Sequence, residues 1–539
     1  MRENRSTRSA FFNRRVLIGF ALSLISVALA LFAFGLIPLK NLGRGGPLLV
    51  AKGGGGPVYK LSGEHTKRMV QGASAAAYAG PRNDLRPVSP VRTTSLRHMP
   101  AIPPRLAPAP VEREPIRPRP PTDVTGTELK VQTFAGALVS APTSTGVSFE
   151  GVGTGIPGFT PSFIPPDTNG RVGATQYVQW NNTSFAVFSK TGTLLYGPVA
   201  GNTLFQPLGG ACLTHNDGDP VVAYDILSGR WILAQFVNGA SPDFSHQCVA
   251  VSATGDALGS YYLYDFVTDS TNFVDYPKIG VWPDGYYMSG HVFNPAGTAF
   301  LAGRIFVFER DKMLQGLPAR QVQKDLKTYN GRPQYGFLPS DLDSLTPPPA
   351  GAAAFVIGPD PVSNKYLDSA RVAVTWGTTP TINLTETRIA ASWSSAPCVG
   401  DPSNVQDFNC VPQPAPATKA DYLDSLYFHL MYRLPYRNFG GNPVQESLVG
   451  NISVKGSASN PAHGAIGWFE FRNAGNSTTA PSVFQASTYD PDNAYRWMGS
   501  IAMDKDQHRA RLQQIEPIGE TINIYHRASQ HRPAQYLGR

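Results

Sequence analysis

The stretch TQYVQWNNTSFAVFSKTGTLLYG, residues 175–197, contains three short strand-forming runs in close succession. Tyr177–Trp180, Phe185–Phe188 and Thr193–Tyr196 are rich in aromatic, aliphatic and β-branched side chains, which favour strands. The turn residues Asn-Asn and Lys-Thr-Gly separate the runs, and such short connections are typical of antiparallel hairpins. The stretch therefore predicts a small antiparallel sheet.

The same texture recurs along the chain from about residue 130. Further groups of short runs contain DPVVAYDILSGRWILAQF, KIGVWPDGYYMSGHVF, AAAFVIG, YFHLMYRL and RWMGSIAMDKD. Similar phrases open several groups: PDTNGRVG, GDPVVAYD, VDYPKIGVWPD and YRWMGSIAMDKD. Repeated small sheets are typical of a radial array, whereas convincing helical periodicity is almost absent. We predict an all-β fold, a six- or seven-bladed β-propeller over residues 129–506, with a pair of β-sandwich domains as the alternative.

The N-terminal part carries an apolar stretch and a charge bias. Residues 16–39 contain no charged side chain, and they are about long enough to cross a bilayer. Five Arg precede them, and the positive-inside rule then keeps the N-terminus in the cytoplasm. We predict a cytoplasmic basic tail (1–15) and a single-pass transmembrane signal-anchor (16–39) in a bacterial cytoplasmic membrane. A cleaved signal peptide is the alternative. Either way the body is in the periplasm or outside the cell.

Charge and composition divide the chain further. Residues 1–121 hold 19 Lys and Arg against 5 Asp and Glu, so the rest of the chain is mildly acidic although the net charge is +8. An acidic body lacks the clustered cations that phosphate binding needs, which argues against a nucleic-acid partner. Residues 40–128 are rich in Pro, Arg and Gly without apolar periodicity, which predicts a disordered linker.

The chain has 4 Cys, an even number that suits an exported, disulfide-bonded body. Four cysteines allow three pairings. We favour Cys212–Cys248 and Cys398–Cys410, because each pair closes a local loop. The absence of a Cys-x-x-Cys motif argues against zinc.

Several phrases, in order, carry a family resemblance: PPDTNGRVG, NDGDPVVAYD, CVAVS, DYPKIGVWPDGYYM, LPSDLD, CVPQP, MYRLPYRNFG, ESLVGNISV and YRWMGSIAMDKD. From about residue 145 to residue 506 the chain resembles a group of uncharacterised bacterial secreted or cell-surface β-propeller proteins, distantly similar to sialidase (BNR) repeats. The resemblance implies the fold and export, and no activity. Residues 507–539 depart from the family pattern. A suitable back-translation restores a family-like reading in the next frame, so we hypothesise a frameshift near codon 507 that alters the last blade.

Acidic residues stand at or near the presumed inner strand of several groups. Equivalent positions of successive blades converge at one end of a propeller's channel. A carboxylate ring there suits Ca²⁺, or a cationic or hydroxyl-rich ligand. The alternative is that each carboxylate caps a local turn. The candidates are Asp167, Asp219, Asp275, Asp343 or Asp368, Asp424 or Glu446, and Arg496 in the last group.

Two local patterns offer further chemistry. HNDGDP, residues 215–220, offers Asn216, Asp217 and Asp219 as calcium ligands, with a plain turn as the alternative. Arg371, Arg388 and Arg496 are available for the substrate carboxylate that sialidase-type chemistry would bind, but no Asp-box is present. His215, His246, His291, His429 and His463, five of the ten His, are scattered, and Trp residues recur about once per group, as expected of structural residues.

These features predict a membrane-anchored extracytoplasmic propeller that acts as a binding or scaffold module. Its ligand is unknown; a glycan or a cell-envelope protein is possible in this location. The alternative is an exported glycan-active hydrolase of sialidase-like type, since any two of the ring acids could provide the carboxyl pair of glycoside hydrolysis. The sequence assigns no catalytic residue and no cofactor beyond the calcium hypothesis.

Overall fold

The structure, a computed structural model, describes most of the chain between residues 85 and 503. All described residues belong to one structural unit, Tyr59–Arg539. They are residues 78–81, 85–104, 118, 121, 123–125, 131–132, 147–153, 156, 159, 165–240, 242–394, 408–412, 422–456, 463–473, 481–491, 495–503, 510–518 and 521–528. The predicted signal-anchor, residues 16–39, lies outside them.

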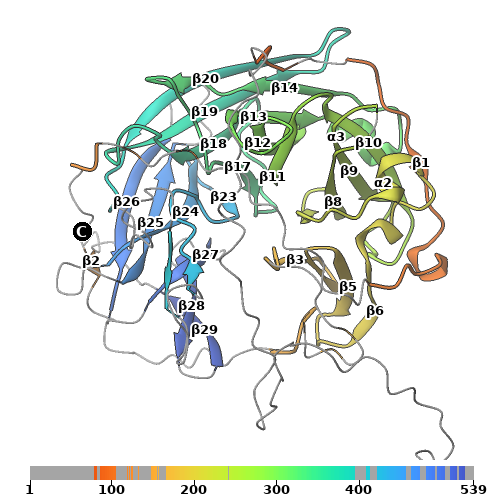
Figure 1. The fold of residues 1–539 in the computed structure, drawn as a ribbon, viewed down its shortest axis with the longest axis horizontal. Helices are drawn as coiled ribbons and strands as arrows, with labels where there is room; N and C mark the ends of the chain where they lie inside the picture. Colours follow the sequence, from red (N-terminus) through yellow and green to blue (C-terminus); the bar gives the residue numbers. More distant parts are fainter. Residues whose placement is uncertain are drawn as a thin grey trace, which may run out of the picture. The chain divides into compact units, whose positions relative to one another are not determined.

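Three antiparallel sheets follow one another between residues 169 and 325 (Figure 1). Each has its four main strands in sequence order, so hairpins connect them. The turns predicted after Trp180 and Phe188 are present. The first sheet contains β3 (Asn169–Val172), β4 (Gln176–Asn181), β5 (Ser184–Ser189) and β6 (Leu194–Ala200); the second β7 (Val221–Asp225), β8 (Arg230–Asn238), β9 (Ser245–Ser252) and β10 (Tyr261–Asp269); the third β11 (Phe273–Trp282), β12 (Gly285–Phe293), β13 (Phe300–Phe308) and β14 (Gln321–Asp325).

Two more four-stranded meanders form the next part, joined into one sheet because β17 pairs in parallel with β23. They are β17 (Leu338–Leu342), β18 (Ala354–Pro359), β19 (Tyr366–Thr375) and β20 (Thr381–Ala390), then β23 (Leu434–Gly440), β24 (Gln445–Lys455), β25 (Gly464–Arg472) and β26 (Ser482–Tyr489). The short strand β2 (Val131–Gln132) pairs with β26. Two small hairpins consist of β15 (Thr328–Tyr329) with β16 (Arg332–Pro333), and β21 (Asn409–Val411) with β22 (Leu423–Asp424).

A last sheet contains β27 (Trp497–Met503), β28 (Ala510–Ile518) and β29 (Thr521–Ala528). Two of its strands lie in residues 507–539, where the sequence departs from the family pattern, and their backbone continues the antiparallel pairing that begins at β27. The frameshift hypothesis concerns the gene and stays a prediction.

Helices are few and short among the described residues. They are η2 (Leu96–His98), η3 (Gly201–Thr203), α2 (Gly210–Thr214) and α3 (Arg310–Gln315). α3 ends at Gly316, whose φ of 65° gives the left-handed C-cap that glycine tolerates best. No helix of the described part is both long and apolar enough to cross a membrane. The all-β prediction is confirmed.

The first strands of successive sheets lie next to one another. β3 contacts β7, β7 contacts β11, β11 contacts β17 and β17 contacts β23, while β27 contacts β23 and β24. Gly280 of β11 shows how close these strands are: a Cβ there would stand 2.3 Å from the carbonyl oxygen of Ser340 in β17. Inner strands that follow one another in this way are the arrangement of β-propeller blades, and we call β3, β7, β11, β17, β23 and β27 the inner strands.

The core lies between neighbouring sheets. Three large clusters of buried apolar side chains each combine residues of at least two sheets. Trp180, Trp231 and Trp282 are among the largest fully buried side chains, Trp497 is buried and Trp376 is partly buried. The recurrent tryptophans therefore pack in the core, as the sequence predicted.

Residues 85–104 differ from the expected disordered linker of residues 40–128. The strand β1 (Val91–Arg92) pairs with β10 and covers that edge of the second sheet. Leu96 is fully buried, and the guanidinium of Arg97 lies 2.6 Å from the Asp256 carboxylate. This part of the predicted linker is packed on the propeller because its few apolar side chains find a partner there.

A disulfide joins Cys212 of α2 to Cys248 of β9, which confirms the first predicted pair. Cys410 is also disulfide-bonded, and Cys398, the remaining cysteine, lies outside the described residues. Disulfides persist in oxidising compartments, so the bond indicates an extracytoplasmic body.

Candidate functional site

The amino-terminal ends of the first three inner strands contain strained backbone. Asp167, just before β3, has a φ of 40°; Asp219, just before β7, has 43°; and Tyr276 in β11 has 54°. Residues other than glycine rarely adopt a positive φ, and such strain gathers at functional sites. The equivalent strain at successive blades makes these strand ends a candidate site.

Two carboxylates meet at these strand ends. The backbone N–H of Tyr276 donates to Oδ2 of Asp219 at 3.2 Å and to Oδ1 of Asp275 at 2.7 Å. Because both oxygens lie one hydrogen-bond length from the same nitrogen, they are no more than about 6 Å apart. Asp219 is buried and Asp275 is half-buried. We call Asp219 and Asp275 the acid pair.

A β-bulge presents the second acid. The pairing of β11 with β12 is regular up to Asp275 and resumes only at Lys278. Bulges bend a strand locally, re-aim its side chains and are frequent beside active sites. Pro277 cannot donate to the β ladder, which suits it to the bulge. The sequence Asp-Tyr-Pro-Lys thus explains why the backbone turns at this point.

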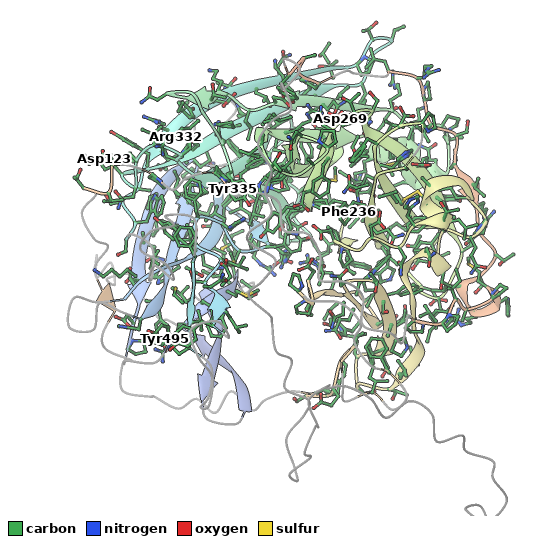
Figure 2. All side chains as sticks on the ribbon, in the orientation of Figure 1. Asp123, Phe236, Asp269, Arg332, Tyr335 and Tyr495 are labelled. Carbon is green, nitrogen blue, oxygen red and sulfur yellow. A yellow bond between two sulfur atoms is a disulfide. The ribbon has the colours of Figure 1, made fainter. Side chains whose placement is uncertain are left out.

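Aromatic rings and histidines surround Tyr276. Its ring stacks on His291 of β12 with centroids 5.1 Å apart, and Nζ of Lys278 lies 3.9 Å from the ring centroid. His291 also stacks on Tyr335, labelled in Figure 2, at 4.0 Å. The ring of His429 lies 5.1 Å from that of Tyr276. These contacts hold the Tyr276 ring in place, and with it the backbone N–H that both acids accept.

His291 is neutral at physiological pH. Burial, followed by the charges of His429 and Lys278, lowers the pKa of His291 well below its usual value. Its Nε2 accepts a hydrogen bond from the backbone N–H of Gly336 at 3.0 Å, which places the ring proton on Nδ1. The imidazole thus links β12 to the chain just before β17.

A second group of charges lies at the carboxyl-terminal ends of the inner strands. Asp343, just after β17, lies 3.1 Å from Nη2 of Arg171 and 3.1 Å from Nη2 of Arg433. Asp341 of β17 lies 2.7 Å from Nη1 of Arg433, and Arg437 of β23 lies 3.7 Å from Asp343. Burial raises the pKa of Asp343, but the three guanidinium groups outweigh it and hold that pKa below its usual value. Asp343 is therefore ionised.

A cavity of about 570 Å³ opens beside this charge cluster. Arg171, Asp343 and Arg433 line it together with the rings of Tyr177 and Tyr224. The sequence analysis did not single out Arg171, Arg433 or Arg437. The sequence clue that could have pointed to these arginines is their position in NGRVG and MYRLPYR, next to or within inner strands.

The remaining ring candidates lie elsewhere. Asp368 is in β19 beside Arg388 of β20. Asp424 ends β22 and accepts the N–H of Leu426, while Glu446 in β24 accepts the hydroxyl of Tyr436. Arg496 precedes β27 and lies over the Tyr489 ring, and Arg371 lies in β19. Of the predicted ring, the structure brings Asp219 and Asp275 into one hydrogen-bonded group and places Asp343 at the opposite strand ends.

The three proposed calcium ligands have separate structural partners. Nδ2 of Asn216 donates to the carbonyl of Thr183, and Oδ2 of Asp217 accepts the N–H of Asn238 at 3.0 Å. Burial raises the pKa of Asp217. The geometry matches the turn alternative better than a calcium loop, and the calcium hypothesis stays a prediction.

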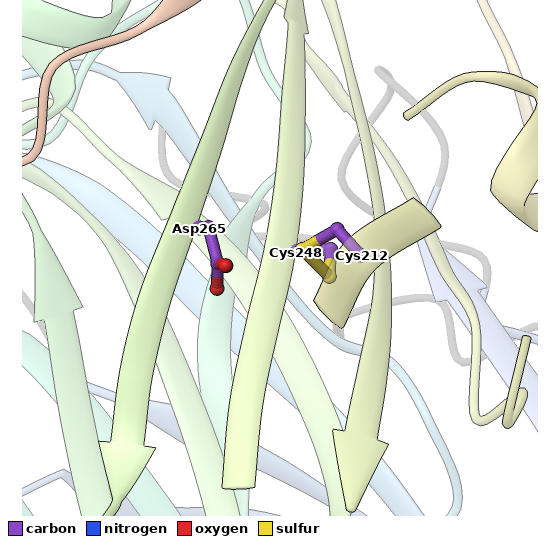
Figure 3. A group of neighbouring side chains, drawn as sticks. All are labelled: Cys212, Cys248 and Asp265. Carbon is purple, nitrogen blue, oxygen red and sulfur yellow. A yellow bond between two sulfur atoms is a disulfide. The ribbon is translucent and has the colours of Figure 1, made fainter. Parts of the chain in front are cut away.

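The described residues contain one group of three metal-ligating side chains close together, namely Cys212, Cys248 and Asp265 (Figure 3). The short helix α2 and the strands β9 and β10 carry them. Both sulfur atoms are bonded to each other, so neither is a thiolate ligand. This group is a disulfide next to a carboxylate.

No family model and no curated protein matches the chain. Solved structures do match, at low similarity. An α-L-arabinanase of Cellvibrio cellulosa with arabinohexaose is 13% identical over 59% of this chain and 94% of that chain, with a TM-score of 0.25. An α-L-arabinanase of Penicillium chrysogenum with arabinobiose is 10% identical over 68% and 94%, with a TM-score of 0.30. A glycosidase-like protein of Bacteroides thetaiotaomicron is 11% identical over 57% and 85%, with 0.26. These neighbours are glycosidases rather than sialidases, and scores this low carry no conclusion about activity.

Proposed function

We propose that this chain is an exported glycan-active hydrolase in which Asp219 and Asp275 are the two carboxyl groups of glycoside hydrolysis. The acid pair carries the proposal: two carboxylates from the ends of neighbouring inner strands share one backbone N–H. A carboxyl pair flanking the scissile bond is what most glycosidases use. The strained backbone and the bulge at the same point support this reading over a binding or scaffold module.

The separation of the acid pair favours a two-step reaction. Retaining glycosidases place their carboxyl groups about 5–5.5 Å apart, whereas inverting enzymes need about 6.5–9.5 Å to admit a water. With the two oxygens within about 6 Å, one group attacks the anomeric carbon as a carboxylate, while the other, as the protonated carboxylic acid, gives its proton to the departing glycosidic oxygen and becomes a carboxylate. The second carboxylate then takes a proton from water, whose oxygen displaces the first carboxylate from the sugar.

The surroundings of the acid pair suit this division of roles. The Tyr276 N–H stabilises a carboxylate on either side, and Lys278 brings a positive charge to the neighbouring ring. The neutral His291 and the ring of Tyr335 pack behind Tyr276 and hold the amide in place. None of these groups has to transfer a proton.

The proposal extends to the whole chain. We take the inner strands as the start of six blades, the last of them containing β27 and its neighbours. Residues 16–39 would anchor the chain in the cytoplasmic membrane, and the disulfide-bonded body would meet glycans outside the cytoplasm.

Substitution of the acid pair tests the proposal. The purified protein is incubated with a panel of oligosaccharides, including arabino-oligosaccharides, and reducing ends are measured. Asp219→Asn and Asp275→Asn should each lower kcat at least a thousandfold with the melting temperature almost unchanged. Asp424→Asn is the matched control, because Asp424 also accepts a local backbone N–H, from Leu426, and does not accept the shared N–H of Tyr276.

Three outcomes decide the case. A specific loss of turnover in the two variants, with partial rescue of a truncated Asp219→Gly or Asp275→Gly variant by azide, supports the pair. Equal losses in Asp424→Asn, or full activity of both pair variants, would refute it. A wild-type protein that binds a glycan of the panel without cleaving it would return the chain to the binding-module class.

A further inference from the structure

We infer that the cavity at the carboxyl-terminal ends of the inner strands is a second ligand site, one that binds a saccharide bearing a carboxylate. It lies beside Asp343, at the opposite strand ends from the acid pair. The inference shares only the ligand class with the proposed function, because the lining residues include neither Asp219 nor Asp275. At about 570 Å³ the cavity has the size of a small-molecule site.

The charges of the site do not balance. Among the residues that the structure describes, Arg171, Arg433 and Arg437 form ion pairs with two carboxylates, those of Asp341 and Asp343. One guanidinium charge is therefore left over in a largely buried cluster. Such a charge is costly unless an anion accompanies it.

The arginines also retain donors that the cluster does not use. Arg171 reaches both carboxylates through the same nitrogen, Nη2. Arg171 lines the cavity, so the other nitrogens of its guanidinium group remain for a ligand. A carboxylate is a planar acceptor that fits the fork of a guanidinium, and it would use these donors.

The rest of the lining suits a sugar ring rather than a bare anion. Tyr177 and Tyr224 contribute aromatic rings, and apolar side chains stand at the rim, with Val172 53% and Leu345 75% exposed. Ligand pockets typically combine apolar and aromatic side chains with a few placed polar or charged groups, as this lining does. The C–H face of a sugar packs on such rings, while its hydroxyls donate to Asp343.

Binding measurements on the full chain test the inference. The probes are trigalacturonate, neutral galactotriose and inorganic phosphate, titrated calorimetrically. Trigalacturonate should bind at least tenfold more tightly than galactotriose, and its affinity should fall as salt increases, because screening weakens the surplus charge. Arg171→Gln should weaken trigalacturonate at least tenfold.

A substitution at the exposed rim of the cavity tests the site without disturbing the fold. Leu345 is exposed, so Leu345→Glu should fold normally and weaken trigalacturonate roughly threefold through repulsion. Leu317→Glu is the control, an exposed leucine outside the cavity lining that should change nothing.

The outcomes separate this site from the acid pair. Asp219→Asn should bind trigalacturonate as the wild type does, so loss of hydrolysis leaves the second site testable. Equal affinity for the acidic and neutral sugars, phosphate binding as tight as trigalacturonate, no binding at all, or no effect of Leu345→Glu would each overturn the inference.

Discussion

Asp368 allows a sharp prediction, because its environment keeps it protonated. It lies in β19 opposite Arg388 of β20 and is 2% exposed. Burial, then the charge of Asp360 and a hydrogen bond to it, raise the pKa of Asp368 to about 9. Asp360 is itself held by the N–H groups of Val362 and Ser363 and by Nε of Arg388 at 2.5 Å. Asp368 is therefore the neutral member of this pair at pH 7.

Because folding raises the pKa of Asp368, the stability of the folded state depends on pH. An aspartate in the unfolded chain has a pKa near 3.8 and releases its proton above that pH, while folded Asp368 retains it up to about pH 9. The folded state therefore loses relative stability as the pH rises from about 4 to 9, by about 1.4 kcal/mol per pH unit. At pH 7 the loss reaches about 4 kcal/mol as an upper value.

Asp368→Asn should remove this loss. The amide can donate a hydrogen bond to Asp360 as the protonated carboxyl does, and it cannot ionise. At pH 7 the variant should be more stable than the wild type by up to about 4 kcal/mol, and near pH 4 the two should be equal. Urea denaturation at several pH values measures this difference, in which the titration of all other groups cancels. Parallel stability curves for the two proteins would refute the reasoning. Asp360→Asn tests the cause of the shift, because removing the charge of Asp360 should lower the pKa of Asp368 and flatten the pH dependence.

Two structural predictions concern links between strands. Arg304 is fully buried between the carboxylates of Asp269, labelled in Figure 2, and Asp325. Arg304→Met should lower the free energy of unfolding by about 3–5 kcal/mol, because both carboxylates would lose their cationic partner. An unchanged melting temperature would contradict this. Cys248→Ser opens a bond that spans 36 residues and should cost about 4 kcal/mol, measured by urea unfolding. Reduction of the wild type also opens the bond of Cys410, so it should cost at least as much, and an equally stable reduced protein would show that the loop is held by its other contacts.

The strand pattern of the sheets could be predicted because it is local in the sequence. Each hairpin joins strands that are neighbours along the chain, and turn residues such as Asn182 and Gly192 mark the reversals with positive φ. The pairing of β1 with β10 could not be predicted in this way, since about 170 residues separate Val91 from Leu263 and no local pattern connects them. The same holds for β17 and β23, which pair in parallel over only three residues.

Some residues of the candidate site could likewise be predicted from local sequence, and others could not. Asp219 and Asp275 could be predicted because each opens a recognisable phrase, and the bulge that brings the second toward the first is marked by Tyr-Pro after Asp275. Asp343 could not be placed from sequence, because it follows its inner strand rather than preceding it, and only the structure shows which strand end it occupies. The arginines around it come from β3, β23 and the residue before β23, so their convergence depends on how the blades are arranged.

The two strand ends therefore differ in kind. At the amino-terminal ends, two carboxyl groups are held together by a strained backbone and a shared amide, and the packed rings behind Tyr276 fix this arrangement. At the carboxyl-terminal ends, opposite charges pair across blades and stabilise the ring while leaving one guanidinium in excess. A strained pair of acids suits chemistry, whereas a compensated cluster beside a cavity suits binding. This contrast is why we assign hydrolysis to Asp219 and Asp275 and recognition to the site around Asp343.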